Sequence, residues 1–133
     1  MTNTETLFTY RLRQVDETLQ DIDNLIASQS SSRSIVNRSY YAMFYAVLAL
    51  FIRLEIPHKT SKHSGIIATF DKAIVHSGLI GAGFSRMLHE TFKARQQLDY
   101  KDMVVLSHDD AMQSVAKARE FVVAIKELIT SKQ

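Results

Sequence analysis

Two arginines stand beside tyrosines in largely apolar segments of the sequence. Arg38 begins the run Arg-Ser-Tyr-Tyr and leads into the apolar segment AMFYAVLALF. Tyr41 lies three residues after Arg38, which places both side chains on one side of a helix. A guanidinium carried into such surroundings needs a partner, because an unpaired buried charge is strongly destabilising. We therefore treat Arg38 and Tyr41 as candidate ligand-binding residues.

The second arginine, Arg95, is followed by Asp99 at i+4 and then by Tyr100. One interpretation is an Arg95–Asp99 salt bridge within a helix, with Tyr100 packing at the helix end. The other is that Arg95 and Arg38 converge on a phosphate, with Asp99 orienting Arg95 through a bidentate contact. Under the second interpretation Arg95, Asp99 and Tyr100 are candidate catalytic residues of an anion site inside a helical bundle.

Lys62 and His63 stand at the expected start of another helix. The N-terminus of a helix attracts anions, and these two side chains would supply further hydrogen-bond donors. We include both as candidate ligand-binding residues. The alternative interpretation is a surface cap or a solvated side chain.

The sequence lacks the patterns of metal and phosphate-loop chemistry. It has no cysteine, which excludes disulfides, thiolate catalysis and cysteine-based metal centres. Glu55-Ile-Pro-His58 resembles half of a di-iron motif, but Pro57 interrupts the helix that would bring both ligands to one face. There is no His-Glu-x-x-His helix and no glycine-rich phosphate loop. We expect neither a metal site nor a cofactor.

Helices must position these residues, as the spacing of the apolar residues indicates. Steps of three and four predict a helix over about 4–27, ended by the serine-rich stretch 28–32. A helix apolar around most of its circumference follows over about 35–54, which is typical of a buried central element. Further helices are predicted from about residue 61 or 62 to Gly78, over about 84–98, and from a capping box at Ser107 and Asp110 to near the C-terminus, while 101–106 is ambiguous. The prediction is an all-α, up-and-down bundle of four to five helices.

Composition bounds the size and surroundings of this bundle. At 133 residues and 46% apolar content the chain fits one domain, residues 1–133, with one core. Residues 56–96 carry six Lys or Arg against two Asp or Glu, a balance of +4, which would attract phosphate or simply form a solvated face. With no signal peptide and no stretch of about eighteen apolar residues, we expect a cytoplasmic protein without a membrane partner.

Three segments occur in a recognisable order along nearly the whole chain: Arg38-Ser-Tyr-Tyr-Ala-Met-Phe-Tyr-Ala, Lys62-His63-Ser64-Gly65 and Arg95-Gln-Gln-Leu-Asp99-Tyr100. This ordered set resembles the HEPN family, and within it a prokaryotic branch with R-x-Y-Y-A and R-x-x-x-D-Y segments. The resemblance implies a HEPN-like helical bundle that forms a homodimer and works with a minimal nucleotidyltransferase protein. Many members are metal-independent ribonucleases or toxins.

The sequence departs from the catalytic HEPN branches at one position. In those branches the arginine that matches Arg95 is followed by a histidine, whereas here the window holds Tyr100 and Lys101. Cleaving RNA without a metal requires a base, an acid and stabilisation of negative charge at phosphorus. Arg95 would supply only the last of these, and an unperturbed tyrosine, with a pKa of about 10, is a poor base.

Three functions therefore stay open. We favour an RNA- or nucleotide-binding component of a nucleotidyltransferase-linked toxin–antitoxin-type module. The alternatives are an active metal-independent ribonuclease, in which His63, Asp99 or Tyr100 handles protons, and a purely structural dimerisation bundle. In related toxin pairs a tyrosine near the motif is nucleotidylated by the partner, and Tyr100 is the matching position.

Overall fold

Every regular element in the described part of the chain is a helix. The computed structural model describes residues 2–58, 62–100 and 105–132, with the backbone only at residues 99 and 100. Its elements are α1 (Asn3–Ala27), α2 (Ser32–Arg53), α3 (His63–Phe70), the π-helical turn η1 (Asp71–Val75), α4 (Ala82–Tyr100) and α5 (His108–Ser131). The predicted all-α bundle is confirmed, and each predicted helix is present with ends shifted by a few residues.

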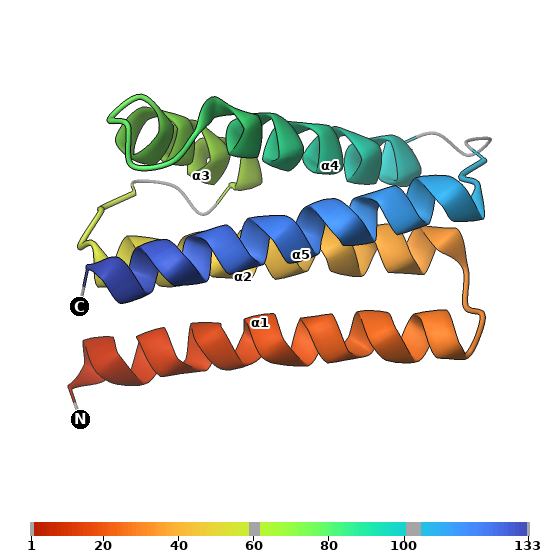
Figure 1. The fold of residues 1–133 in the computed structure, drawn as a ribbon, viewed down its shortest axis with the longest axis horizontal. Coiled ribbons are helices and arrows are strands. Elements are labelled where there is room, and N and C mark those ends of the chain that lie inside the picture. The colour runs from red at the N-terminus through yellow and green to blue at the C-terminus, as the bar shows by residue number, and fades with distance from the viewer. Residues whose placement is uncertain (1, 59–61, 101–104, 133) are drawn as a thin grey trace.

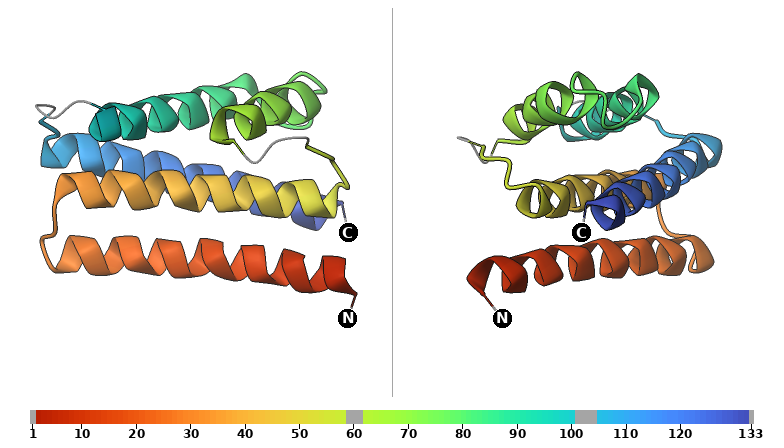
Figure 2. Two further views of the ribbon diagram at one scale, coloured as in Figure 1. Left: turned by 180° about the vertical axis from the view of Figure 1, so that it is seen from behind. Right: turned by 60° about the vertical axis from the view of Figure 1, so that its left-hand side comes forward.

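The helices stack in three layers. In Figure 1, α1 forms the bottom layer, α2 and α5 lie in the middle, and α3 and α4 cover them. The two views in Figure 2 keep this order. The end of α1, the beginning of α2 and the end of α4 lie on the same side of the bundle, at the right of Figure 1. The predicted site residues of α2 and α4 belong to this side.

α2 is the buried centre because its sequence is apolar around most of its circumference. It packs against α1, α5 and α4. Among its large side chains, Tyr40, Met43 and Leu50 have no exposed surface. By length and hydropathy alone α2 could cross a membrane, yet 67% of its apolar window is buried inside the bundle. Packing against three helices accounts for its apolar character, and the cytoplasmic location stays a prediction.

The predicted third helix is interrupted by the π-helical turn η1. Asp71, at the start of η1, accepts a hydrogen bond from Ser85 Oγ (2.6 Å) and lies 2.6 Å from His89 Nε2. Both partners belong to α4, so these contacts fasten η1 to α4. The chain then leaves at Gly78, which has a φ of +85° and ends the segment where the sequence predicts.

Two helices end with a non-glycine residue in the left-handed region. Gln29 follows α1 with a φ of 55°, and Glu55 follows α2 with a φ of 57°. After Glu55, the backbone N–H of Ile56 donates to the carbonyl oxygen of Phe51 at 2.9 Å. This is a Schellman arrangement, in which glycine is the usual left-handed residue. Because neither position holds a glycine, the sequence does not indicate either turn.

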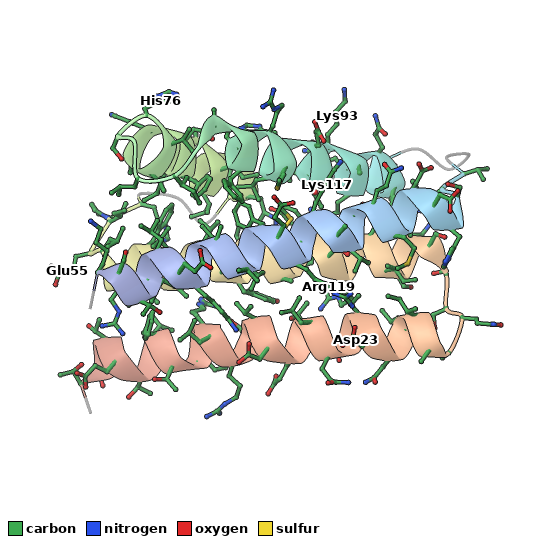
Figure 3. All side chains as sticks on the ribbon, in the orientation of Figure 1. Asp23, Glu55, His76, Lys93, Lys117 and Arg119 are labelled. Carbon is green, nitrogen blue, oxygen red and sulfur yellow. The ribbon has the colours of Figure 1, made fainter. Side chains whose placement is uncertain are left out.

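α5 begins at the predicted capping box. Ser107 Oγ accepts from the backbone N–H of Asp110 at 3.0 Å, and the Asp110 carboxylate accepts from the N–H of Ser107 at 3.3 Å. Ion pairs at the surface join α5 to its neighbours: Arg119–Asp23 (Figure 3) and Lys126–Asp16 to α1, and Lys117–Glu90 to α4. Such surface pairs contribute little to stability, because water and salt screen them. Of the ambiguous stretch 101–106, residues 101–104 lie outside the described part, and residues 105 and 106 are not helical.

Candidate functional site

Arg38 and Arg95 come together around one tyrosine ring. Arg38, on α2, places its guanidinium carbon 4.9 Å from the centre of the Tyr41 ring. Arg95, on α4, places its own 5.2 Å from the same ring and 5.5 Å from the ring of Tyr40. Aromatic faces attract cations, so the two tyrosines hold both guanidinium groups at the contact between α2 and α4. Two cations that are far apart in the chain therefore converge.

Both guanidinium groups open into a pocket of about 420 Å³. Its lining combines apolar walls with polar and cationic side chains: Leu25, Arg33, Ser34, Asn37, Arg38, Arg95 and Leu98. We call this the arginine pocket. Its volume lies in the range of small-ligand sites, and among the described side chains its lining holds three arginines and no carboxylate. A net positive, partly apolar hollow of this kind favours an anionic ligand.

Two of the three arginines are oriented by neutral acceptors. Asn37 Oδ1 accepts hydrogen bonds from Arg38 Nε (3.2 Å) and Nη2 (2.9 Å). Arg33 Nη1 donates to the backbone carbonyl of Leu98, near the end of α4, at 2.5 Å. These acceptors fix the guanidinium groups without cancelling their charge. Because a guanidinium carries five N–H donors, Arg38 and Arg33 keep donors for a ligand.

Sequence reasoning missed Arg33, Ser34 and Asn37. A signal for one of them was available, since Ser34, Arg38 and Tyr41 recur at i, i+4 and i+7 and so share one stripe of α2. The contact between Arg33 and the end of α4 had no such signal, because it depends on how α2 and α4 pack. The pocket is therefore richer in cations than the sequence indicated.

His63 contacts the tyrosines but does not line the arginine pocket. Its Nδ1 lies 3.0 Å from the hydroxyl oxygen of Tyr40, and its ring stacks on Phe44 with the centroids 4.2 Å apart. Burial, and after it the positive charge of Arg95, lowers the pKa of His63 below its ordinary value of 6.5. Burial also raises the pKa of Tyr40, with Arg95 opposing that change. At neutral pH the pair is an uncharged imidazole beside a protonated phenol.

The other predicted site residues are less informative. Lys62 is exposed at the N-cap of α3, beside His63, and does not line the pocket. Asp99 and Tyr100 belong to the last turn of α4, but their side chains lie outside the described residues. The contact between Asp99 and Arg95 therefore stays a prediction.

The side chains of the site allow anion binding and proton exchange. The guanidinium groups can bind and neutralise an anion, and the uncharged imidazole of His63 can accept a proton. Within residues 2–58, 62–98 and 105–132, no group of three or more His, Asp or Glu side chains is arranged to hold a metal ion.

Known proteins match the chain along most of its length. The sequence model of the HEPN domain family matches residues 8–128, which include the whole arginine pocket. A protein of Thermotoga maritima named "UPF0332 protein" is 32% identical over 129 residues, which cover 97% of this chain and 96% of that protein. In Methanocaldococcus jannaschii, "Putative toxin MJ0142" is 28% identical over 91% of this chain and 80% of that protein, and "Putative toxin MJ0605" is 29% identical over 73% and 70%.

Proposed function

This chain belongs to the HEPN family, and from that premise we propose that its arginine pocket binds the phosphate group of a nucleotide or RNA within a toxin–antitoxin-type module. The observation that carries the proposal is the convergence of Arg38 and Arg95 on one ring and one pocket. The names of the two Methanocaldococcus jannaschii relatives support a toxin-related role.

The electrostatics of the pocket support binding over a purely structural role. Like charges held together repel each other, and a bound anion removes that repulsion. Phosphate oxygens also match the donor fork of a guanidinium. A purely structural network is expected to pair a half-buried arginine with a carboxylate. Arg38 instead bonds the neutral side chain of Asn37, which leaves its charge available to a ligand.

Binding is tested by titrating a labelled oligoribonucleotide and inorganic pyrophosphate at several salt concentrations. We expect affinity to fall as salt rises, because phosphate contacts release counterions. Arg38→Ala and Arg95→Ala should each weaken binding about tenfold or more, the effect of losing a hydrogen bond to a charged group. Arg13→Ala, which removes an exposed arginine of α1 outside the pocket, is the matched control. No binding to the unmodified protein at low salt would refute the proposal.

His63 supports a second candidate function, RNA cleavage without a metal. The lowered pKa of His63 keeps its imidazole uncharged at neutral pH, as a general base requires. The ribose 2′-oxygen would attack phosphorus and displace the 5′-oxygen while its proton passes to Nε2. The imidazolium would then return this proton to the leaving oxygen, and Arg95 would stabilise negative charge on the phosphate oxygens. Nε2 is basic only when Nδ1 carries the ring proton and donates it to Tyr40. Because His63 does not line the arginine pocket, we rank cleavage second.

A cleavage assay separates these two candidates. Degradation of RNA in EDTA that is lost in both Arg95→Ala and His63→Gln would establish the ribonuclease. Intact RNA in an assay where binding is measurable would leave binding as the function of the site.

The proposed module has two further components, a second copy of the chain and a minimal nucleotidyltransferase. Both follow from the family resemblance. Light scattering of the purified protein at micromolar concentration measures its mass in solution. The mass of a single chain would rule out the homodimer. Coexpression with a minimal nucleotidyltransferase from the same genome tests that partnership, with mass spectrometry of Tyr100 as the readout for nucleotidylation.

A further inference from the structure

A second hollow with different chemistry adjoins the arginine pocket. It has a volume of about 330 Å³ and is lined by Asp21, Asn24, Leu25, Ser28 and Arg38. Leu25 and Arg38 line both hollows, so the two share a wall. The two hollows therefore lie side by side, one at the cations of α2 and α4 and the other at the polar C-terminal end of α1, and we call the pair the groove.

Asp21 and Arg38 line the same hollow without pairing. The guanidinium of Arg38 bonds Asn37 instead. Asp21 is exposed, and no ion pair or side-chain hydrogen bond joins it to another residue in the described part of the chain. A carboxylate here weakens the attraction of the groove for a bare anion. Its two oxygens accept hydrogen bonds, so it favours a ligand that carries donors as well as negative charge.

The neighbours of Asp21 add complementary groups. The Asn24 Oδ1 atom accepts a hydrogen bond from Gln20 Nε2 at 3.2 Å, which directs the Asn24 amide N–H groups elsewhere. Leu25 supplies an apolar wall. Beside the cation Arg38, the second hollow therefore offers a carboxylate and an amide donor, with Leu25 as an apolar wall. A nucleotide presents a phosphate, a sugar with hydroxyl donors and a base in that order.

We propose that the groove recognises a ribonucleotide, with the phosphate at Arg38 and Arg95 and the ribose 2′-hydroxyl donating to Asp21. This inference rests on the proposed phosphate-binding function. Carboxylates accept hydrogen bonds from the ribose 2′-hydroxyl in dinucleotide sites, and this hydroxyl is the group that distinguishes RNA from DNA. Asp21 is then a specificity-determining residue, because it contributes affinity only when the hydroxyl is present.

The test compares inorganic phosphate, 5′-AMP and 2′-deoxy-AMP by calorimetric titration of the full chain. The unmodified protein should bind 5′-AMP about tenfold or more tightly than 2′-deoxy-AMP, the effect of one hydrogen bond to a charged acceptor. Asp21→Ala should lower the affinity for 5′-AMP to that for 2′-deoxy-AMP. The affinity for inorganic phosphate should stay unchanged or rise slightly. Glu17→Ala is the matched control: it removes an exposed carboxylate one turn earlier on α1, outside both hollows, and should keep the preference.

Several outcomes would overturn the assignment of Asp21 while phosphate binding stands. These are equal affinities for the two nucleotides in the unmodified protein, a preference that survives Asp21→Ala, and a preference that Glu17→Ala also removes. A gain in affinity for all three ligands in Asp21→Ala would mean that Asp21 only repels anions. If none of the three ligands binds, inorganic phosphate included, both the proposed function and this inference are refuted. Circular dichroism checks that both variants fold.

Discussion

Replacing Arg38 with glutamine should separate ligand binding from fold stability. The change removes a cation–π contact with Tyr41, worth about 0.5–1 kcal/mol at a half-exposed site, and two hydrogen bonds to Asn37, which the glutamine amide or water can replace. It also relieves repulsion from Arg95. The two guanidinium carbons lie 4.9 and 5.2 Å from one ring centre, so they are at most about 10 Å apart and repel by at least about 0.4 kcal/mol in water, or about 1.7 kcal/mol at an effective dielectric of 20. A carboxylate beside Arg95, predicted to be Asp99, would reduce this repulsion, so we use the lower value.

These two effects nearly cancel. Glutamine and arginine have similar helix propensities, so the exchange adds little further change. We expect the free energy of unfolding of Arg38→Gln without ligand to stay within about 1 kcal/mol of the unmodified protein, a shift in Tm of less than about 5 °C. Loss of the charge-assisted contacts to phosphate should instead weaken affinity about 10- to 100-fold.

The assay is thermal denaturation with increasing pyrophosphate, at constant ionic strength maintained with chloride. A saturating ligand raises the stability of the unmodified protein by about 2.7 kcal/mol at 100 times its Kd. Arg38→Gln should need at least about tenfold more pyrophosphate for the same rise in Tm, whereas Arg13→Gln should behave as the unmodified protein does. The reasoning is refuted if Arg38→Gln loses several kcal/mol without ligand, or if its response to pyrophosphate is unchanged.

Three further substitutions test the surroundings of the site. Tyr40→Phe removes the hydroxyl that lies 3.0 Å from His63 Nδ1 and should lower the free energy of unfolding, measured in urea, by about 0.5–1.5 kcal/mol. An unchanged free energy of unfolding would mean that water replaces this contact. The fold lowers the pKa of His63, so the unfolded state binds a proton more readily than the folded state does. The free energy of unfolding is therefore highest above about pH 6.5 and falls as the pH drops toward the pKa of His63 in the folded protein. His63→Gln should flatten that part of the stability–pH profile relative to the unmodified protein, and His76→Gln, at an exposed position, should not. Glu55→Gly should raise stability by roughly 0.5–1 kcal/mol, because glycine adopts a φ of 57° without strain, and a lower Tm would contradict this.

The sequence predicted the helices well because their determinants are local. Apolar steps of three and four residues located α1 and α5, and the pair Ser107 and Asp110 located the start of α5 to the residue. The turn η1 was not predictable, since its apolar spacing is compatible with a continuous α-helix. Nor were the turns at Gln29 and Glu55, where the backbone adopts a glycine-like conformation without glycine.

The candidate site was predictable only in part. The i, i+3 spacing of Arg38 and Tyr41 is a local signal, and the two side chains are in contact as it predicts. The position of Arg95 beside the same ring depends on the packing of α2 against α4, which no short-range pattern encodes. Arg33 is held at the pocket by its hydrogen bond to a backbone carbonyl of α4. Every residue carries such an acceptor, so the sequence could not indicate this contact.

The central place of α2 bears on how the molecule can be divided. α1, α4 and α5 all pack against α2, so removing any of them would expose apolar side chains such as Ile35, Met43 or Phe51 to water. We therefore expect the bundle to unfold as one cooperative unit. A fragment that keeps α2 without its neighbours should associate with other chains through the uncovered surface. Variants of single residues in the intact chain are thus the informative way to dissect this protein.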